Sequence, residues 1–150
     1  MPRVQREANV TWEGNVARGG GTISAATSGA FSDLAFSLPT RIGKAEGKTS
    51  PEELLAAAHG GCVTMSLAGE LSGGGTPPGR LDVTCTIVMD EVEGQGHQIV
   101  GSRIEFVVAV DGLDDAALQA AAEKADEGCP FSTLIRASAS VSVRAVLESN

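Results

Sequence analysis

The sequence has 150 residues, with 19 Asp or Glu against 11 Lys or Arg, so its formal net charge is −8. This length fits a single domain of residues 1–150 that buries a substantial core. The apolar share of 42% is too high for a disordered chain, and it is spread too evenly for a membrane span. The acidic charge disfavours nucleic acid as a partner, and only 3% aromatic residues disfavours a surface that stacks bases or sugars.

The three cysteines are an odd number without dense spacing, which does not fit a small disulfide scaffold. Residues 1–10 lack the apolar core of a secretory signal. We therefore expect a cytoplasmic protein. In a reducing compartment a cysteine pair is more often catalytic or redox-active than structural.

The first third of the chain predicts short strands joined by turns. Residues 10–14 and 22–24 form extended runs on either side of a glycine-rich break. Leu34, Phe36 and Leu38 alternate with small or polar residues, which is the period of a half-buried strand, and Pro39 closes that run. We predict a small antiparallel meander here.

A long helix is predicted from Pro51 to about Leu71. Ser50 is a favourable N-cap, Pro51 suits the first helical position, and Glu53 completes a capping box. The helix is apolar most of the way round, which predicts burial on most sides. The pair Gly60-Gly61 in its middle costs helix stability, about 1 kcal/mol per glycine relative to alanine. That cost indicates a close approach by another segment.

The remaining chain predicts strands and two more helices. Residues 81–90 and 104–110 alternate as paired strands, and a last strand covers residues 139–145. Residues 114–127 form an amphipathic helix that Gly128 ends, and a short helical turn follows over residues 130–136. The fold class is α+β, with helices packed on an antiparallel sheet.

Each cysteine has a different predicted setting. Cys62 lies in the middle of the apolar helix, where a buried cysteine is usually a small core residue. Cys129 follows a helix-ending glycine and precedes a proline, so it is a predicted N-cap whose thiol pKa the nearby backbone N–H groups can lower. Cys85 shares the apolar face of a strand and is interpreted as core.

The two histidines give no specific metal signal. His59 lies three residues before Cys62 on the same helical face, which leaves open a Cys–His nucleophile pair or part of a zinc site with Cys129. His97 is predicted to lie in a turn. A zinc site needs further ligands, and the sequence has no paired cysteine or histidine spacing that supplies them.

Two charged residues lie close in sequence to the apolar helix. An arginine beside a cysteine favours the thiolate, and a carboxylate holds an arginine in place by a bidentate pair. Arg41 and Glu53 are the candidates for these roles. From the residues alone, a solvated loop charge for Arg41 and a helix cap for Glu53 are the better explanations.

Several segments together resemble the OsmC/Ohr family, the osmotically inducible protein C and organic hydroperoxide resistance proteins. Residues 50–62, SPEELLAAAHGGC, resemble the signature helix of the family, and residues 128–132, GCPFS, resemble its second cysteine motif. Residues 12–14 with Arg18-Gly19, and Thr40-Arg41, resemble the OsmC branch. The similarity covers essentially the whole chain. One departure is Gly60-Gly61, where the family more often has alanine.

The resemblance implies a thiol-dependent peroxidase that reduces organic hydroperoxides to alcohols and protects against oxidative stress. Cys62 would attack the peroxide, Cys129 would resolve the sulfenic acid, Arg41 would activate the thiolate and Glu53 would position the arginine. It implies an OsmC-like fold, with antiparallel sheets packed around a long buried central helix and a second helix, in an intertwined homodimer. It also implies a dithiol reductant such as a dihydrolipoyl protein, and no metal, flavin or haem.

Helix geometry adds a constraint on Glu53. It precedes Cys62 by nine residues, roughly 13.5 Å of rise and about 180° of rotation on a straight helix. Either the helix is broken between them, or Glu53 acts on the active site of a partner chain. The apolar helix favours the second route, with Arg41 also from the partner. Two other functions stay open: an OsmC-like binding or structural protein without turnover, and a zinc module built from His59, Cys62 and Cys129.

Overall fold

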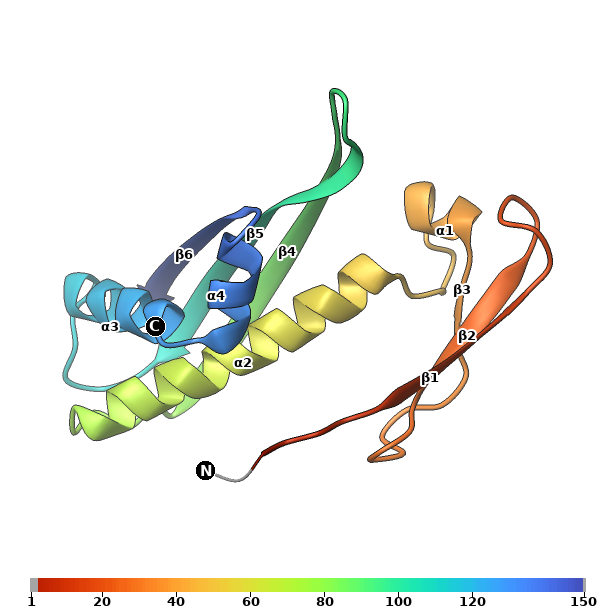
Figure 1. The fold of residues 1–150 in the computed structure, drawn as a ribbon. Helices are drawn as coiled ribbons and strands as arrows, with labels where there is room; N and C mark the ends of the chain where they lie inside the picture. The colour runs from red at the N-terminus through yellow and green to blue at the C-terminus, as the bar shows by residue number, and fades with distance from the viewer. Residues whose placement is uncertain (1–2, 150) are drawn as a thin grey trace. The chain divides into compact units, whose positions relative to one another are not determined.

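The computed structural model describes residues 3–149, which form two compact units that meet in sequence at Pro51 and Glu52. Each unit has its own three-stranded sheet. The first sheet belongs to the N-terminal unit, and the second belongs to the larger C-terminal unit, which also carries three helices (Figure 1). Each unit is described here by itself.

The N-terminal unit is the antiparallel meander that the sequence predicts. Its strands are β1 (Ala8–Glu13), β2 (Gly20–Ala25) and β3 (Leu34–Phe36), paired in that order. The rings of Trp12 and Phe36 pack 5.4 Å apart between centroids. Two aromatic rings at that separation are a large apolar contribution for so small a sheet.

The predicted end of the third strand is wrong. The strand stops at Phe36, and a short helix, α1 (Leu38–Ile42), follows. Ser37 caps this helix by accepting a hydrogen bond from the Thr40 backbone N–H, and Pro39 occupies its first turn. The apolar alternation through Leu38 favoured a longer strand over a helix that begins after Ser37. A serine before an X-Pro pair is nevertheless a helix-start signal.

The long helix of the C-terminal unit is α2 (Pro51–Gly73), which runs unbroken through both central glycines. Its buried face comprises His59, Gly60, Val63, Leu67 and Leu71. The expectation of burial on most sides is wrong for the single chain, because Met65 on another face is 72% exposed. Beside Gly60 a Cβ atom would lie 3.2 Å from Cys85 Cβ, which confirms the close approach there, whereas Gly61 faces open space.

The second sheet has the order β4-β5-β6, with β4 (Arg80–Val92) and β5 (Gly96–Ala109) as a long antiparallel hairpin. The last strand, β6 (Ser140–Leu147), pairs with β5 in parallel. The sheet is therefore mixed, and the prediction of an antiparallel sheet is wrong at this strand. Two helices connect β5 to β6, and such a crossover returns the chain in the original direction.

The crossover contains α3 (Asp115–Glu127) and α4 (Pro130–Arg136), both at the predicted positions. Figure 1 shows α2, α3 and α4 on the same face of the sheet. Along β5 the inward side chains Ile104, Phe106 and Val108 are buried, and the residues between them face outward. They pack with Val63, Leu67, Leu71, Leu118, Ala122 and Ala145 in one core cluster.

The length and composition of α2 also satisfy the criteria for a membrane-spanning helix. It has 23 residues and a mean hydropathy of 1.2 over 18 of them, so composition alone does not exclude a span. The core helix of a globular protein meets the same criteria. Because α2 packs Val63, Leu67 and Leu71 into the core cluster, we interpret it as a core helix.

Candidate active site

Two of the predicted site residues, Cys62 and Cys129, lie in contact. The Cys129 thiol donates a hydrogen bond to Cys62 Sγ, with the two sulfur atoms 3.2 Å apart. Cys62 is partly accessible in the middle of α2, and Cys129 is fully buried. A partly accessible thiol therefore lies against a buried one.

The fold brings together two thiols that lie 67 residues apart in the sequence. Gly128 closes α3, and Cys129 is the N-cap of α4, with extended backbone angles and no capping bond from its side chain. The prediction of an N-cap is therefore confirmed. Because its sulfur does not cap the helix, the Cys129 thiol is available to Cys62.

Within the C-terminal unit the surroundings of Cys62 do not favour its thiolate. Burial raises the pKa of the Cys62 thiol, and the adjoining Cys129 thiol raises the same pKa further. A backbone hydrogen bond from Phe131, in the first turn of α4, lowers this pKa by less. Among the described residues of this unit, no cation contributes to lowering the pKa of Cys62.

His59 lies in a buried polar network and does not pair with Cys62. Its Nδ1 shares a hydrogen bond of 2.7 Å with Ser102 Oγ, and its Nε2 shares one of 2.7 Å with Ser132 Oγ. Burial lowers the pKa of His59, opposed by Asp126 and supported by Arg136. With both ring nitrogens occupied by hydroxyl groups, neither alternative for His59, nucleophile partner or zinc ligand, matches its geometry.

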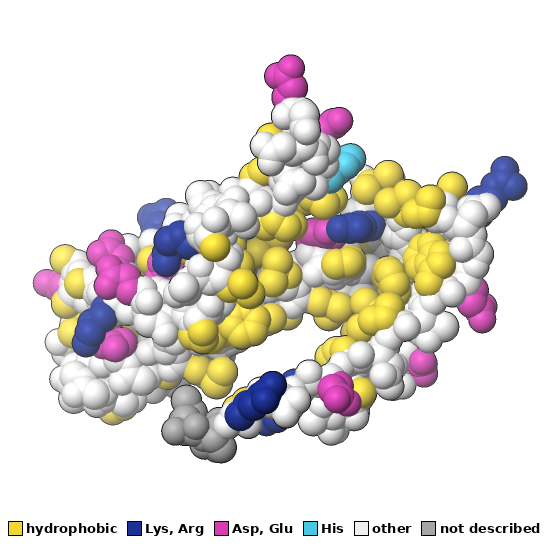
Figure 2. Space-filling model, in the orientation of Figure 1, with side chains coloured by type: hydrophobic (Ala, Val, Ile, Leu, Met, Phe, Trp, Pro, Cys, Tyr) yellow, Lys and Arg dark blue, Asp and Glu magenta, His cyan; other side chains and the backbone are white. Residues whose placement is uncertain are grey.

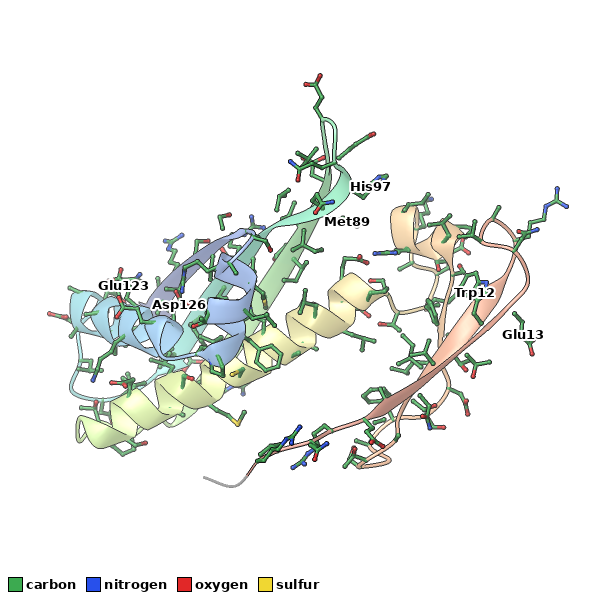
Figure 3. All side chains as sticks on the ribbon, in the orientation of Figure 1. Trp12, Glu13, Met89, His97, Glu123 and Asp126 are labelled. Atoms are coloured by element: carbon green, nitrogen blue, oxygen red, sulfur yellow. The ribbon has the colours of Figure 1, made fainter. Side chains whose placement is uncertain are left out.

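The other histidine and cysteine occupy separate settings in the C-terminal unit. His97 is in β5, paired with Glu91 of β4, so its prediction as a turn residue is wrong (Figure 3). Cys85 packs against the core cluster, and its Sγ lies 3.5 Å from Ser102 Oγ. Within residues 3–149, no three His, Cys, Asp or Glu side chains are grouped as metal ligands.

Glu53 and Arg41 belong to different units. Glu53 is in the first turn of α2 and lines a groove of about 360 Å³ together with Gly60, Gly61 and Cys85. Because α2 is continuous from Glu53 to Cys62, the nine-residue spacing places them on opposite sides of the helix. Arg41 is in α1, where it lines a cavity of about 190 Å³ beside Trp12 and Phe36.

Sequence reasoning missed the serines that hold His59. Ser102 occupies an inward position of β5, in phase with Ile104 and Phe106, where a polar residue requires a buried partner. Ser132 follows Cys129 by the same three residues that separate His59 from Cys62. These two features are the signals that point to the network.

Comparison with known proteins settles the family. The sequence profile of the family described as OsmC, OsmC-like protein, matches residues 43–144. The chain belongs to the OsmC-like family. It is 34% identical over 134 residues to peroxiredoxin OsmC of Escherichia coli (strain K12), covering 89% of this chain and 92% of that protein.

A second OsmC-like relative is the organic hydroperoxide resistance protein of Xanthomonas axonopodis pv. citri (strain 306). The identity is 30% over 129 residues, covering 85% of this chain and 88% of that one. Among solved structures, the organic hydroperoxide resistance protein OhrB of Bacillus subtilis superposes with a TM-score of 0.70 at 25% identity, covering 95% of this chain and 98% of that chain. The higher identity to peroxiredoxin OsmC places this chain in the OsmC branch. The α+β OsmC-like fold predicted from the sequence is thereby confirmed, apart from the parallel β6.

Proposed function

We propose that this chain is a cysteine-based peroxidase that reduces organic hydroperoxides to alcohols and thereby protects against oxidative stress. The observation that carries the proposal is the contact between Cys62 and Cys129, with their sulfur atoms 3.2 Å apart. The relatives named peroxiredoxin OsmC and organic hydroperoxide resistance protein support the same chemistry.

The first step uses the Cys62 thiolate. Its sulfur attacks the terminal oxygen of the hydroperoxide, the O–O bond breaks, and the alkoxide takes a proton to leave as an alcohol. Cys62 is left as a sulfenic acid. Cys62 is partly accessible, so a hydroperoxide can reach its sulfur, whereas buried Cys129 is protected from it.

The second step uses Cys129. Its sulfur attacks the oxidised sulfur of Cys62, an S–S bond forms, and the S–O bond breaks with loss of water. A dithiol, such as the dihydrolipoyl group of a protein, then reduces the disulfide by thiol–disulfide exchange. Two protein thiols supply the two electrons that the hydroperoxide accepts, so the cycle balances on cysteine chemistry alone. We place it in the cytoplasm, where dithiols are kept reduced.

Ionisation of Cys62 requires a cation, since burial and the Cys129 thiol raise its pKa. We assign this role to Arg41, whose guanidinium favours a neighbouring thiolate, and we assign Glu53 to hold Arg41 by a bidentate pair. Glu53 and Cys62 lie on opposite sides of an unbroken α2. We therefore propose a homodimer in which Glu53 and Arg41 serve Cys62 of the partner chain.

The surface of the C-terminal unit supports such a dimer. Hydrophobic side chains are exposed on this unit in the view of Figure 2, and the large ones include Met65 of α2, 72% exposed, and Leu134 of α4, 67% exposed. Exposed apolar patches of this kind mark contact surfaces. A second copy of the chain would remove them from water.

A steady-state peroxidase assay tests the proposal. Cumene hydroperoxide and tert-butyl hydroperoxide are supplied as substrates, with dihydrolipoamide, glutathione or thioredoxin as reductant. We expect turnover with dihydrolipoamide, and none in Cys62→Ser, because a hydroxyl group near neutral pH does not replace a thiolate. If no hydroperoxide is consumed with any reductant, the chain is an OsmC-like binding or structural protein and the proposal is wrong.

A further inference from the structure

A second bond ties α2 to α4 one helical turn from the thiol pair. We propose that the hydrogen bond between His59 Nε2 and Ser132 Oγ positions Cys129 for its attack on oxidised Cys62. His59 and Ser132 are positioning residues in this account, since neither contacts a reacting sulfur in the described structure. The inference rests on the proposed function for the step that it concerns.

The spacing of the four residues makes the two contacts neighbours. His59 precedes Cys62 by three residues on α2, and Ser132 follows Cys129 by three residues at the start of α4. Residues three apart on a helix share a face. The bond of 2.7 Å between His59 and Ser132 and the contact of 3.2 Å between the sulfurs therefore join the same two helix faces.

Ser102 makes His59 a rigid anchor. The imidazole is fully buried, and its other nitrogen is held at 2.7 Å by Ser102 of β5, in the middle of the sheet. In a neutral imidazole one nitrogen donates and the other accepts, so the two serines take opposite roles and fix the ring orientation. The sheet thus holds His59, and His59 holds α4.

The start of α4 needs this anchor. The helix has seven residues, and its N-cap Cys129 makes no side-chain capping bond. At the far end of α4, Arg136 forms an ion pair with Asp126 of α3. Figure 3 shows Asp126 beside α4. Among the described residues, the hydrogen bond of Ser132 to His59 joins the first turn of α4 to α2, beside the Phe131 backbone hydrogen bond to the Cys62 thiol.

Disulfide formation requires the first turn of α4 to hold the Cys129 sulfur in a narrow range of positions. The sulfur atoms must close from 3.2 Å to about 2 Å, with a restricted dihedral angle. In this step the Cys129 sulfur attacks Cys62 sulfur, the S–O bond breaks, and the released hydroxide takes the proton of the Cys129 thiol to form water. A misplacement of about 1 Å can cost a reaction of this kind about 100-fold in rate.

The experiment compares two serines that bond to the same imidazole. Ser132→Ala removes the tie to α4, whereas Ser102→Ala removes an equally buried bond and leaves that tie in place. Reduced protein receives one equivalent of cumene hydroperoxide. Dimedone trapping follows the sulfenic acid, and non-reducing peptide mass analysis follows the Cys62–Cys129 disulfide.

We expect Ser132→Ala to form the sulfenic acid at the wild-type rate and the disulfide about 10- to 100-fold more slowly. Ser102→Ala, which loosens His59 but keeps its bond to Ser132, should slow the disulfide by a smaller factor than Ser132→Ala. Ser132→Thr, which keeps the hydroxyl group, should recover most of the wild-type rate. Wild-type resolution in Ser132→Ala, or equal slowing in Ser102→Ala, would overturn the positioning role.

A second measurement separates this inference from the proposed function. Equilibration with glutathione redox buffers reports how strongly the fold favours the Cys62–Cys129 disulfide without any hydroperoxide. Ser132→Ala should shift that equilibrium toward the dithiol, and Ser102→Ala should shift it by less. If wild-type protein does not react with hydroperoxide but Ser132→Ala still shifts the equilibrium, the proposed function is wrong and the positioning role stands. If both serine variants match wild type, the positioning is wrong.

Discussion

The thiol of Cys62 lies in surroundings that oppose its ionisation, so its proposed activation depends on a charge from elsewhere. Burial and the Cys129 thiol both raise its pKa, and a mid-helix position receives little help from the helix dipole, which acts over the terminal turns. The proposed source is Arg41. Its effect on Cys62 is measurable without any hydroperoxide.

Arg41→Ala should move the alkylation of Cys62 by iodoacetamide to higher pH, because the thiolate loses its counter-charge. Arg41→Lys should recover only part of the shift, since an ammonium does not make the bidentate pair. Peptide mass analysis resolves Cys62 from the other two cysteines. The control is Lys44→Ala, which removes an exposed positive charge three residues away. A profile for Arg41→Ala that overlays wild type contradicts the activation role.

His59 should make the stability of the chain sensitive to mild acid. Burial lowers its pKa, so below about pH 6.5 the unfolded chain binds a proton that the folded chain resists. The contribution is fully present above about pH 6.5 and is lost as the pH falls toward the folded pKa. Urea unfolding on either side of that pH should show a smaller loss in His59→Gln than in wild type. His97→Gln, which changes an exposed histidine, should keep the wild-type loss.

At the residue scale, the sequence predicts the local settings of the two cysteines better than the hydrogen-bond network that surrounds them. Cys62 and Cys129 stand in recognisable local settings, an apolar helix and a Gly-Cys-Pro helix start. Their contact is a tertiary event, and the resemblance to a known family supplied it. Ser102 and Ser132 are common residues whose burial depends on packing across three elements. The inward phase of Ser102 and the spacing of Ser132 mark them out, but they do not identify His59 as the shared partner.

At the scale of elements, α2, α3 and α4 follow from caps and apolar periodicity, and the structure confirms all three. The parallel direction of β6 was not predictable in the same way. Alternation along a strand identifies its buried face but does not encode its direction relative to a neighbour. The two helices between β5 and β6 were the available signal, because parallel strands need a long crossover.

The two glycines of α2 should respond differently to alanine. A Cβ atom at Gly60 would lie 3.2 Å from Cys85 Cβ, whereas one at Gly61 meets no atom of its own chain within 4 Å. Alanine in an open helix position gains about 0.5–1 kcal/mol over glycine. We expect Gly60→Ala to be less stable than Gly61→Ala by about 1 kcal/mol in urea unfolding at matched protein concentration. The reverse order would show that α2 does not lie against β4 at Gly60.

At the scale of the whole molecule, the proposed homodimer explains both the exposed Met65 and the position of Glu53 opposite Cys62 on α2. A shared active site makes a distinctive prediction. A mixed dimer of Cys62→Ser and Glu53→Ala chains would contain one site with both changes and one with neither.

Co-refolding these two inactive chains should therefore restore up to half of the wild-type activity per mixed dimer. Distinct affinity tags on the two chains show that mixed dimers have formed. Glu52→Ala changes the adjacent carboxylate and should keep activity by itself. Monomeric chains at micromolar concentration, or mixed dimers that stay inactive, would contradict the shared site.

The central claim is that Cys62 and Cys129 together take two electrons to a hydroperoxide, and intact mass after a single turnover tests it most directly. One equivalent of cumene hydroperoxide added to reduced wild-type protein should remove the mass of two hydrogen atoms and link the Cys62 and Cys129 peptides. Cys129→Ser should instead gain one oxygen atom, trapped by dimedone on Cys62, and Cys62→Ser should not change. An unchanged wild-type mass, or a disulfide that involves Cys85, would contradict the account.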